Sequence, residues 1–154
     1  MFGHDGSHDV SCADSHDVKQ NMMPLQIRIA RPVTNLNRAQ TMYCAGLDLR
    51  VIGRFDDHAG FDGVMLGRAG LQYHFEFTTC RNHPVMPNPT FEDLTVFYIA
   101  DAAEWQRASA QMLAAGFESV ASNNPYWDVH GRTFQDPDGY RTVLQNAVWE
   151  PVVY

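Results

Sequence analysis

The first structured stretch of the chain combines a strand pattern with a helix pattern. Residues 25–31 read Leu-Gln-Ile-Arg-Ile-Ala-Arg, an alternation of apolar and polar positions that is typical of a half-buried strand. Asn35, a residue type that often caps helices, then precedes an amphipathic pattern that includes Met42 and Tyr43. The pattern therefore predicts a strand, a capped helix and a connection between them.

The same order returns further along the chain. Residues 94–100, Leu-Thr-Val-Phe-Tyr-Ile-Ala, give a second strand pattern, and Asp101 stands in the capping role before a second helical stretch. Gly116 is placed to end this helix, because glycine accepts the left-handed conformation that often follows a last turn. The two caps lie 66 positions apart (101 minus 35). This spacing indicates an internal repeat.

Each predicted helix is followed by strand-like runs that turn signals separate. In the first copy these are residues 49–53, 63–67 and 71–78; in the second they are 118–120, 132–134 and 140–145. Residues 136–139, Asp-Pro-Asp-Gly, predict a tight turn before the last run, since proline presets the first corner and glycine supplies a positive φ. The repeated unit is therefore predicted to be βαβββ.

A duplicated βαβββ unit predicts the α+β class. One copy alone cannot bury both faces of its sheet, so we expect two modules that together form a curved eight-stranded mixed sheet around a cavity. The predicted domain covers residues 24–150, with module one at 25–80, a proline-containing linker at 81–92 and module two at 93–149.

Residues 1–23 differ in composition from the rest. Glycine, serine and aspartate alternate there with His4, His8 and His16, and large apolar side chains are scarce. The composition predicts a disordered tail, either a solvated extension or a misassigned start, whose His-Asp pairs could also capture a transition metal adventitiously.

The net charge and the distribution of apolar residues argue against nucleic acid and membrane as partners. The formal net charge is −7, and the 11 Lys and Arg residues form no basic stripe, so nucleic acid is not an expected partner. No stretch reaches the roughly 20 apolar residues of a membrane-spanning helix, and no signal-peptide pattern opens the chain. Three cysteines without CxxC spacing suggest reduced thiols. We therefore expect a cytoplasmic location and no membrane partner.

Several short motifs in this repeated order resemble the vicinal oxygen chelate (VOC) superfamily, the glyoxalase, bleomycin resistance protein and dioxygenase-like domains. They are Met42-Tyr43 at the predicted end of the first helix, Leu47-Asp48-Leu49 where the family usually has Leu-Gly-Leu, and the Asp-Pro-Asp-Gly turn. More specific segments at residues 57–67, 73–77 and 124–128 resemble a glyoxalase-like branch of this superfamily. The resemblance spans residues 25–149 and implies a fold more firmly than an activity.

In metal-dependent members of this superfamily, the first and fourth strands of each module supply four ligands to a divalent ion. Counting back from the helix caps places Arg28 and Leu94 at the first-strand positions, and Glu76 and Val143 fall at the fourth-strand positions. Only Glu76 has a donor for a cation, since a guanidinium has no lone pair to give and the other two side chains are hydrocarbon. The usual four-ligand centre is therefore not expected, and no cofactor is predicted.

The same count predicts that Arg28 and Glu76 project from one face of module one. They would then form a buried or half-buried ion pair in place of the metal. The pair is either structural or functional. In the functional interpretation Arg28 recognises a carboxylate or phosphate on a ligand, and Glu76 orients the ligand or acts as a base.

An alternative metal site remains open at the level of sequence. His74 and Glu76 are two residues apart and share one face of a strand, so they could form a two-ligand corner with His58 as the third ligand. This site would hold zinc, iron, manganese or nickel, with Glu76 and His74 as tentative catalytic residues. The alternative for each histidine is an ordinary hydrogen bond to its neighbours.

Aromatic residues supply further candidates for a ligand site. Tyr126 and Trp127 lie in a loop stiffened by Pro125, which suits either a ligand lid or an interface. Tyr98 follows Phe97 on a predicted central strand, so one of the two faces the cavity and the other the helix. Plain packing over the cavity mouth is the alternative for the loop aromatics.

Three functions follow as hypotheses. The first is a glyoxalase or bleomycin resistance-like protein that binds a small molecule in the sheet cavity, with or without catalysis, and lacks the four-ligand metal site. The second is a metal-dependent lyase, isomerase or dioxygenase. The third is a structural homodimer without a ligand. A homodimer is expected in any case, because the resemblance implies pairing of modules across subunits and two-fold pairs are the commonest oligomers.

Overall fold

The computed structural model describes residues 25–152, which form two modules of the predicted order. Module one contains β1 (Ile27–Pro32), α1 (Leu36–Leu47), β2 (Arg50–His58), β3 (Phe61–Gly67) and β4 (Tyr73–Cys80). Module two contains β5 (Leu94–Tyr98), α2 (Ala102–Ala114), β6 (Glu118–Val120), α3 (Tyr126–Val129), β7 (Gly131–Gln135) and β8 (Arg141–Gln145). The predicted tail, residues 1–23, lies outside the described residues.

The two modules have the same sheet topology. The strand orders are β1-β4-β3-β2 and β5-β8-β7-β6, with the first and fourth strands of each module parallel and the other pairs antiparallel. The α+β class and the glyoxalase fold are thus confirmed. Within the single chain the eight strands form two four-stranded sheets, and β1 and β5 are edge strands.

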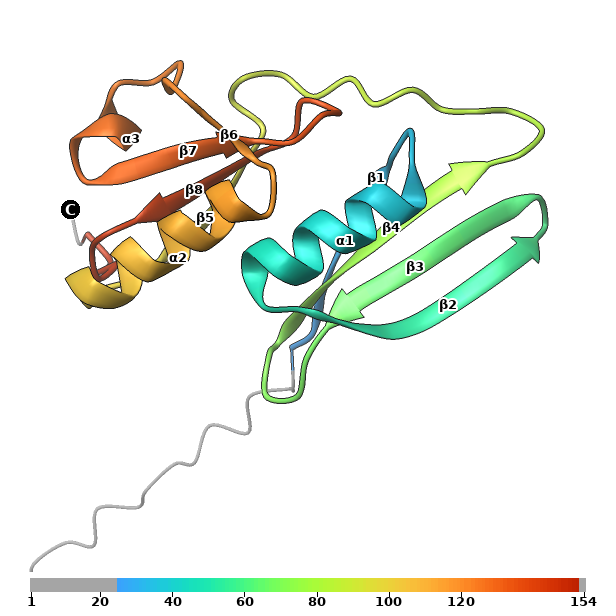
Figure 1. Ribbon diagram of the computed structural model, residues 1–154, viewed down its shortest axis with the longest axis horizontal. Helices are drawn as coiled ribbons and strands as arrows, with labels where there is room; N and C mark the ends of the chain where they lie inside the picture. Colours follow the sequence, from blue (N-terminus) through green and yellow to red (C-terminus); the bar gives the residue numbers. More distant parts are fainter. Residues whose placement is uncertain (1–24, 153–154) are drawn as a thin grey trace, which may run out of the picture.

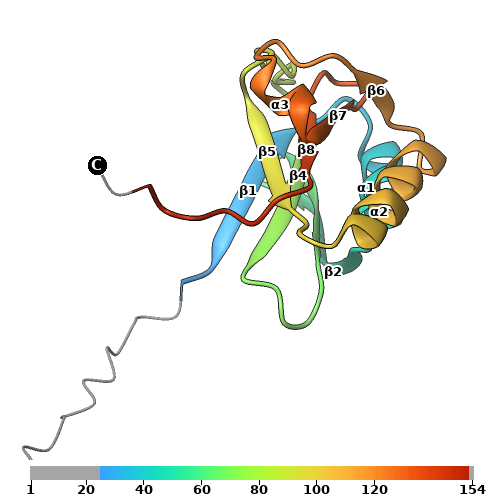
Figure 2. The same cartoon turned by 90° about the vertical axis from the view of Figure 1, so that its left-hand side faces the viewer.

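The two long helices, α1 and α2, lie on the same side of the strands (Figure 1, Figure 2). Figure 1 shows α1 and α2 side by side in front of the two sheets, and the side view of Figure 2 places them together on one face. Among residues 25–152, no helix covers the opposite face of module one (Figure 1, Figure 2). No helix among residues 25–152 is long and apolar enough to cross a membrane.

The helix starts follow the sequence, but the first helix ends later than predicted. Asn35 and Asp101 accept hydrogen bonds from the backbone N–H groups of Arg38 and Glu104, as caps do. Helix α1 continues to Leu47, so the predicted end at Met42-Tyr43 is wrong. Asp48 caps this end with a φ of 52°, in the left-handed region that glycine would enter without strain.

The predicted loop around Tyr126 and Trp127 is instead a short helix, α3. The sequence reads as a loop because Asn124 and Pro125 are turn residues. The same residues also start helices: the Asn124 side chain accepts a hydrogen bond from the N–H of Tyr126, and Pro125 already has helical backbone angles. One turn of helix therefore presents both aromatic side chains.

The core joins the two modules around Tyr43. Its ring is fully buried and lies 5.3 Å from Phe75, 4.7 Å from Phe77 and 5.1 Å from Phe117 between ring centroids. Phe117 belongs to module two, and the other two rings belong to module one. Such edge-to-face contacts stabilise aromatic clusters beyond simple burial. The modules therefore share one core on the helix side of the sheets.

The predicted Asp-Pro-Asp-Gly turn also connects the modules. The Tyr43 hydroxyl donates to Asp136 Oδ2 at 2.8 Å, and Asp138 accepts hydrogen bonds from the N–H and hydroxyl of Thr34 at 3.1 and 2.5 Å. The Tyr140 hydroxyl donates to the carbonyl oxygen of Pro32 at 2.8 Å. Burial raises the pKa of Asp136, although hydrogen bonds from Tyr43 and two backbone N–H groups act in the opposite direction. The turn thus fastens module two to the start of α1.

Candidate functional site

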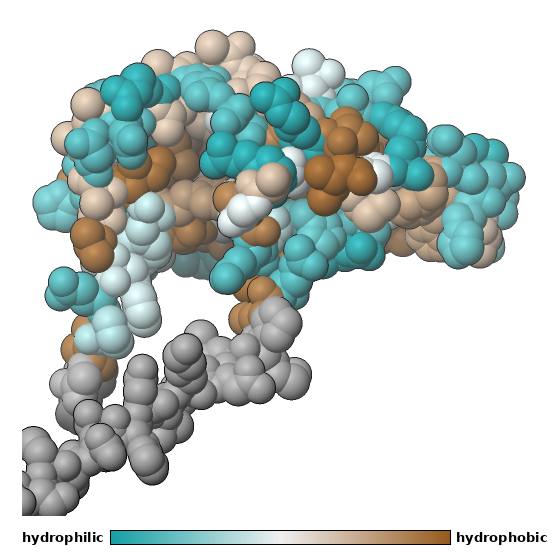
Figure 3. Space-filling view, turned by 90° about the horizontal axis from the view of Figure 1, so that it is seen from below, coloured by the Kyte–Doolittle hydropathy of each residue, from teal (hydrophilic) through white to brown (hydrophobic). Residues whose placement is uncertain are grey.

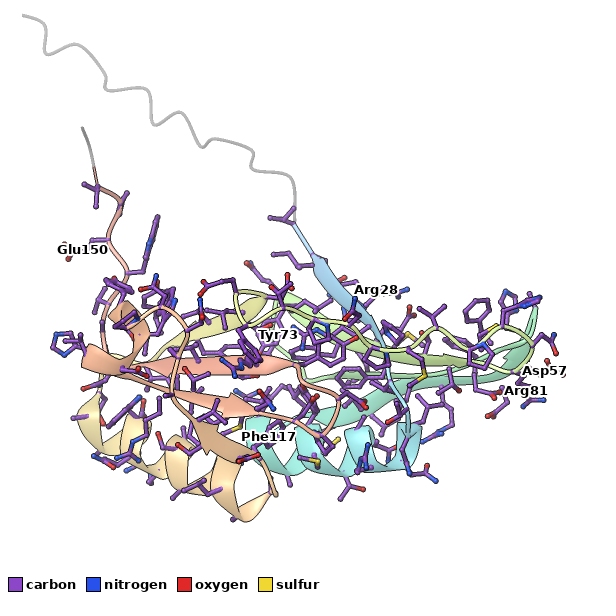
Figure 4. All side chains as sticks on the ribbon, turned by 90° about the horizontal axis from the view of Figure 1, so that it is seen from above. Arg28, Asp57, Tyr73, Arg81, Phe117 and Glu150 are labelled. Atoms are coloured by element: carbon purple, nitrogen blue, oxygen red, sulfur yellow. The ribbon has the colours of Figure 1, made fainter. Side chains whose placement is uncertain are left out.

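The register of β1 and β4 positions a cluster of polar side chains on the open face of module one. In this parallel pair Arg28 lies beside His74, and Ala30 lies beside Glu76. Side chains two residues apart on a strand share a face, so Arg28, His74 and Glu76 all point away from α1. Figure 4 shows Arg28 on the side of the strands opposite the helices.

Arg28 is held by three partners. Its Nε donates to His74 Nε2 at 2.9 Å, its Nη1 donates to Glu76 Oε2 at 3.0 Å, and its Nη2 lies 3.7 Å from Met65 Sδ. The predicted ion pair between Arg28 and Glu76 is therefore present. Because His74 Nε2 accepts a hydrogen bond, the proton of the neutral imidazole lies on Nδ1. We call these four residues the Arg28 cluster.

The ion pair is only half-buried. The Glu76 side chain is 16% exposed, whereas the Arg28 side chain is 51% exposed. Each guanidinium nitrogen has one protein partner, so one N–H of Nη1 and one of Nη2 remain for water or a ligand. A planar donor group that is oriented in this way can bind an anion without first losing side-chain freedom.

An apolar surface surrounds the Arg28 cluster. On the same face, a Cβ built on Gly63 would lie 2.2 Å from the Phe55 ring, and one built on Gly53 would lie 2.7 Å from Met65 Cε. These glycines thus let Phe55 and Met65 lie flat across the sheet. Ile52, which is 56% exposed, lies along Gly67 next to His74. A charged group is therefore set in an open, largely apolar sheet face.

The residues present do not fit a four-ligand metal centre. Leu94 and Val143 occupy the first- and fourth-strand positions of module two, as counted from the sequence, and neither has a donor atom. In module one, His74 Nε2 and Glu76 Oε2 are both engaged by Arg28.

The alternative site with His58 is not formed. His58 pairs with Phe61 at the tip of the β2–β3 hairpin, and Phe61 lies opposite Cys80, at the far end of β4 from Glu76. Figure 4 shows neighbouring Asp57 and Arg81 well away from Arg28. Within residues 25–152, no three His, Cys, Asp or Glu side chains are grouped to hold a metal ion. His58 instead stacks edge-on to Phe55, at 6.3 Å between ring centroids.

At the tip of the β2–β3 hairpin, side chains form hydrogen bonds with nearby backbone and side-chain groups. Asp62 accepts from the N–H of Asp57 at 2.9 Å and from both Nε and Nη2 of Arg81. The hydrogen bond from Arg81 lowers the pKa of Asp62. The polar residues around His58 thus have a structural role in the described chain.

The predicted aromatic residues are not brought to the Arg28 cluster. Tyr126 and Trp127 pack against each other at 4.9 Å between ring centroids, on α3, and Gly131 approaches the Trp127 carbonyl so closely that a Cβ there would lie 2.6 Å from its oxygen. They therefore belong to the α3 and β7 region of module two. Tyr98 is 39% exposed at the end of β5, while Phe97 packs toward the core, as the alternation predicts.

A cavity of about 780 Å³ lies between the modules. Residues of β1, the linker and β5 line it, together with Tyr140: Ile29, Arg31, Asn88, Pro89, Glu92, Asp93, Leu94, Thr95 and Val96. Neither Arg28 nor Glu76 contributes. The prediction of one cavity lined by this pair is therefore replaced, within the single chain, by an open sheet face and a separate groove between the modules.

Two sequence profiles match the chain, the YycE-like N-terminal domain over residues 27–78 and the YycE-like C-terminal domain over residues 92–146. The YycE protein of Bacillus subtilis (strain 168) is 42% identical over 122 residues, which are 79% of this chain and 88% of that protein. The chain belongs to the YycE family. The crystal structure of the Bacillus subtilis YycE protein superimposes with a TM-score of 0.75 at 40% identity, covering 82% of this chain and 93% of the other.

More distant structures share the fold. The fosfomycin resistance protein FosX of Mesorhizobium loti has a TM-score of 0.60 at 13% identity, over 79% of this chain and 90% of its own. The trypanothione-dependent glyoxalase I of Leishmania major has a TM-score of 0.58 at 19% identity, over 78% and 84%. These structures confirm the fold that the resemblance to the VOC superfamily implied.

Sequence reasoning missed two residues of this YycE-like chain. Met65 contacts Arg28 only because β3 places it opposite Glu76, a pairing that the sequence does not contain. Arg31 stacks over the rings of Phe75 and Tyr140, at 5.5 and 4.7 Å from their centroids. The sequence did contain an indication for Arg31. It occupies the apolar side of the alternating pattern, where a charged side chain needs a polar or aromatic partner.

Proposed function

We propose that this YycE-like protein binds a small molecule that carries a carboxylate or phosphoryl group, with Arg28 as the anchor for that group. The supporting observation is that each nitrogen of the guanidinium has a protein partner that fixes its orientation, while 51% of the side chain remains exposed. Fixed orientation combined with exposure is unusual for an arginine that serves stability alone, because an exposed ion pair contributes little to folding.

The chemistry of the Arg28 cluster supports this ligand class. A guanidinium offers paired N–H groups that match the two oxygens of a carboxylate or phosphoryl group. Glu76 and His74 act on Arg28 as positioning residues, and the apolar surface formed by Phe55, Met65 and Ile52 would hold the remainder of the ligand. Binding of this kind requires no metal ion. Solved relatives in fold named for fosfomycin or bleomycin resistance support a small-molecule role in general terms.

We also propose that two copies pair over this face. Ile52 and Phe61 expose 56% and 42% of their surfaces on this face of module one. Strands β1 and β5 also leave one edge each without a strand partner among the described residues. A second copy would cover apolar surface and complete an enclosed ligand site that one chain leaves open.

The test is nuclear magnetic resonance of the arginine side chains in the full chain. Inorganic phosphate and benzoate are added separately, up to about 20 mM, a range that detects millimolar dissociation constants. We expect the Arg28 Nε–H signal to shift in a saturable manner. The matched control is Arg54→Met, because Arg54 lies on the helix side of the same sheet and bonds Gln40.

Two outcomes would overturn the proposal. One is an Arg28 signal that does not respond to either anion. The other is a saturable response of the whole spectrum that is the same in Arg28→Met as in the wild type, since the anions would then bind elsewhere. Loss of the response in Arg28→Met with its retention in Arg54→Met supports the proposal.

A further inference from the structure

A second cavity, distinct from the Arg28 cluster, lies between the modules. Its volume is about 270 Å³, and it is lined by the end of α1, the start of β4, the end of β5 and one face of α2: Gly46, Leu47, Asp48, Arg68, Tyr73, Phe97, Tyr98, Ile99, Ala108, Gln111 and Leu144. Figure 3, which views the molecule from below, shows apolar side chains exposed in hollows on this underside. We call this cavity the inter-module pocket.

Part of the wall of the inter-module pocket is aromatic and aliphatic. Tyr73 and Phe97 come from different modules and lie 5.6 Å apart between ring centroids, at an interplanar angle of 49°. Leu47, which is partly buried, and Leu144, which is buried, also line the pocket. Aromatic and aliphatic walls of this kind favour a planar ring, which contacts both ring faces and hydrocarbon at once.

The polar groups at the rim are balanced in charge. Arg68 Nη1 lies 2.8 Å from Asp48 Oδ2, so the one cation at the rim is already paired. Gln111 uses its amide N–H to donate to the carbonyl oxygen of Ala45 at 2.7 Å, which leaves its amide oxygen as an acceptor. Burial raises the pKa of the Tyr73 hydroxyl, so that it stays protonated and uncharged at neutral pH. The pocket therefore offers hydrogen-bonding groups without a net charge.

We infer that the inter-module pocket binds an uncharged planar ring that carries a hydrogen-bond donor, of the size and chemistry of indole. The size agrees, because an apolar cavity of about 150 Å³ can hold benzene and this one is larger. The donor would meet the Gln111 amide oxygen or the Tyr73 hydroxyl oxygen. This site is separate from the proposed anion site, since none of its lining residues belongs to the Arg28 cluster.

The experiment is a titration of the full-length protein with indole, followed by amide chemical shifts. A dissociation constant on the order of 1 mM is expected for so small a ligand in a half-open pocket. The shifts should concentrate at residues 46–48, 97–99 and 108–111. Benzofuran, which has the same shape but no N–H donor, should bind about fivefold more weakly.

Filling the pocket provides the matched comparison. Ala108→Leu adds bulk on the pocket side of α2, and Ala110→Leu adds the same bulk on the exposed side. Ala108→Leu should weaken indole binding by at least about tenfold, and Ala110→Leu by less than about twofold. The inference is overturned if both variants bind indole equally, if the shifts lie around Arg28 instead, or if no saturable binding is seen.

Discussion

At the residue scale, the energetics of the site depend on how much water reaches Arg28. A fully buried guanidinium stripped of its carboxylate would cost several kcal/mol, but the Arg28 side chain is 51% exposed and the vacated charge can be hydrated. The ion pair therefore contributes about 1 kcal/mol to the free energy of unfolding.

Glu76→Gln tests this ion pair directly. We expect the free energy of unfolding to fall by about 1 kcal/mol, because Arg28 loses its charged partner while the amide keeps a weaker hydrogen bond. Arg28→Met combined with Glu76→Gln should recover much of that loss, since no charge remains unmatched. Urea denaturation of the single and double variants measures both effects. A double variant whose loss equals the sum of the two single losses would show that the residues are not coupled.

The sequence was informative about Arg28 and Glu76 for a simple geometric reason. Each sits at a fixed distance from a recognisable feature, a helix cap or a strand pattern, so their shared face followed from counting alone. Met65 and Arg31 did not follow, because their contacts depend on strand register and on the approach of module two. His58 was placed near Glu76 only as an alternative, and the length of the β2–β3 hairpin separates them.

At the element scale, the turn at residues 136–139 is the main polar connection between the modules. Asp136 is buried, and its carboxylate accepts hydrogen bonds from the Tyr43 hydroxyl at 2.8 Å and from the N–H groups of Asp138 and Tyr140, both at 2.9 Å. Desolvation nevertheless raises its pKa, so the charged form costs more in the folded state than in the unfolded state.

The pH dependence of this turn has a defined sign. Because the folded pKa of Asp136 is raised, its contribution to stability is complete below the unfolded pKa of about 4 and is lost as pH rises through the folded pKa. Asp136→Asn mimics the protonated form. We therefore expect the variant to gain stability relative to the wild type as pH rises from 4 toward 7, as measured by thermal unfolding at each pH.

Asp62→Asn is the control that distinguishes the effect of burial at Asp136 from the effect of an ion pair on a carboxylate. The pKa of Asp62 is lowered by its hydrogen bond from Arg81, so its contribution has the opposite sign and is lost as pH falls. Asp62→Asn should therefore lose stability relative to the wild type at neutral pH, and the difference should shrink on acidification. If Asp136→Asn showed that same profile, burial would not govern the Asp136 carboxylate.

Most elements were predictable because periodicity and capping chemistry are local. The strands, both long helices and their caps follow the pattern closely, whereas α1 runs four residues further than the Met42-Tyr43 motif indicated (47 minus 43). Aspartate in a left-handed C-cap carries no sequence signal as strong as glycine. Helix α3 was missed because Asn124 and Pro125 serve turns and helix starts equally well.

At the scale of the whole molecule, the chain leaves one sheet face open. Proteins seldom leave exposed apolar surface of this kind without a partner, and within residues 25–152 the edge strands β1 and β5 are among those with one side unpaired. We expect a homodimer at tens of micromolar in sedimentation velocity, about the concentration at which modest two-fold interfaces form. Ile52→Lys on the open face should shift the protein toward monomer, and Leu113→Lys on exposed α2 should not. A monomeric wild type at that concentration would contradict the pairing.

The class of fold was predictable at this scale because a repeated βαβββ unit has few ways to bury its faces. The arrangement of the two modules was not. Whether eight strands form one sheet or two depends on side-chain packing between β1 and β5, where Arg31 Nη2 donates to Thr95 Oγ1 at 2.7 Å and no backbone ladder forms in the described chain.

We infer that Arg28 takes the place of a metal ion on the open face of module one. Calorimetric titration of zinc, manganese, nickel and iron(II) into a chain beginning at Pro24 tests it most directly, because the histidines of residues 1–23 are then absent. We predict that wild type and Glu76→Gln give the same heats, without a stoichiometric site that depends on Glu76. One metal ion bound per chain in the wild type, and lost in Glu76→Gln, would contradict the account.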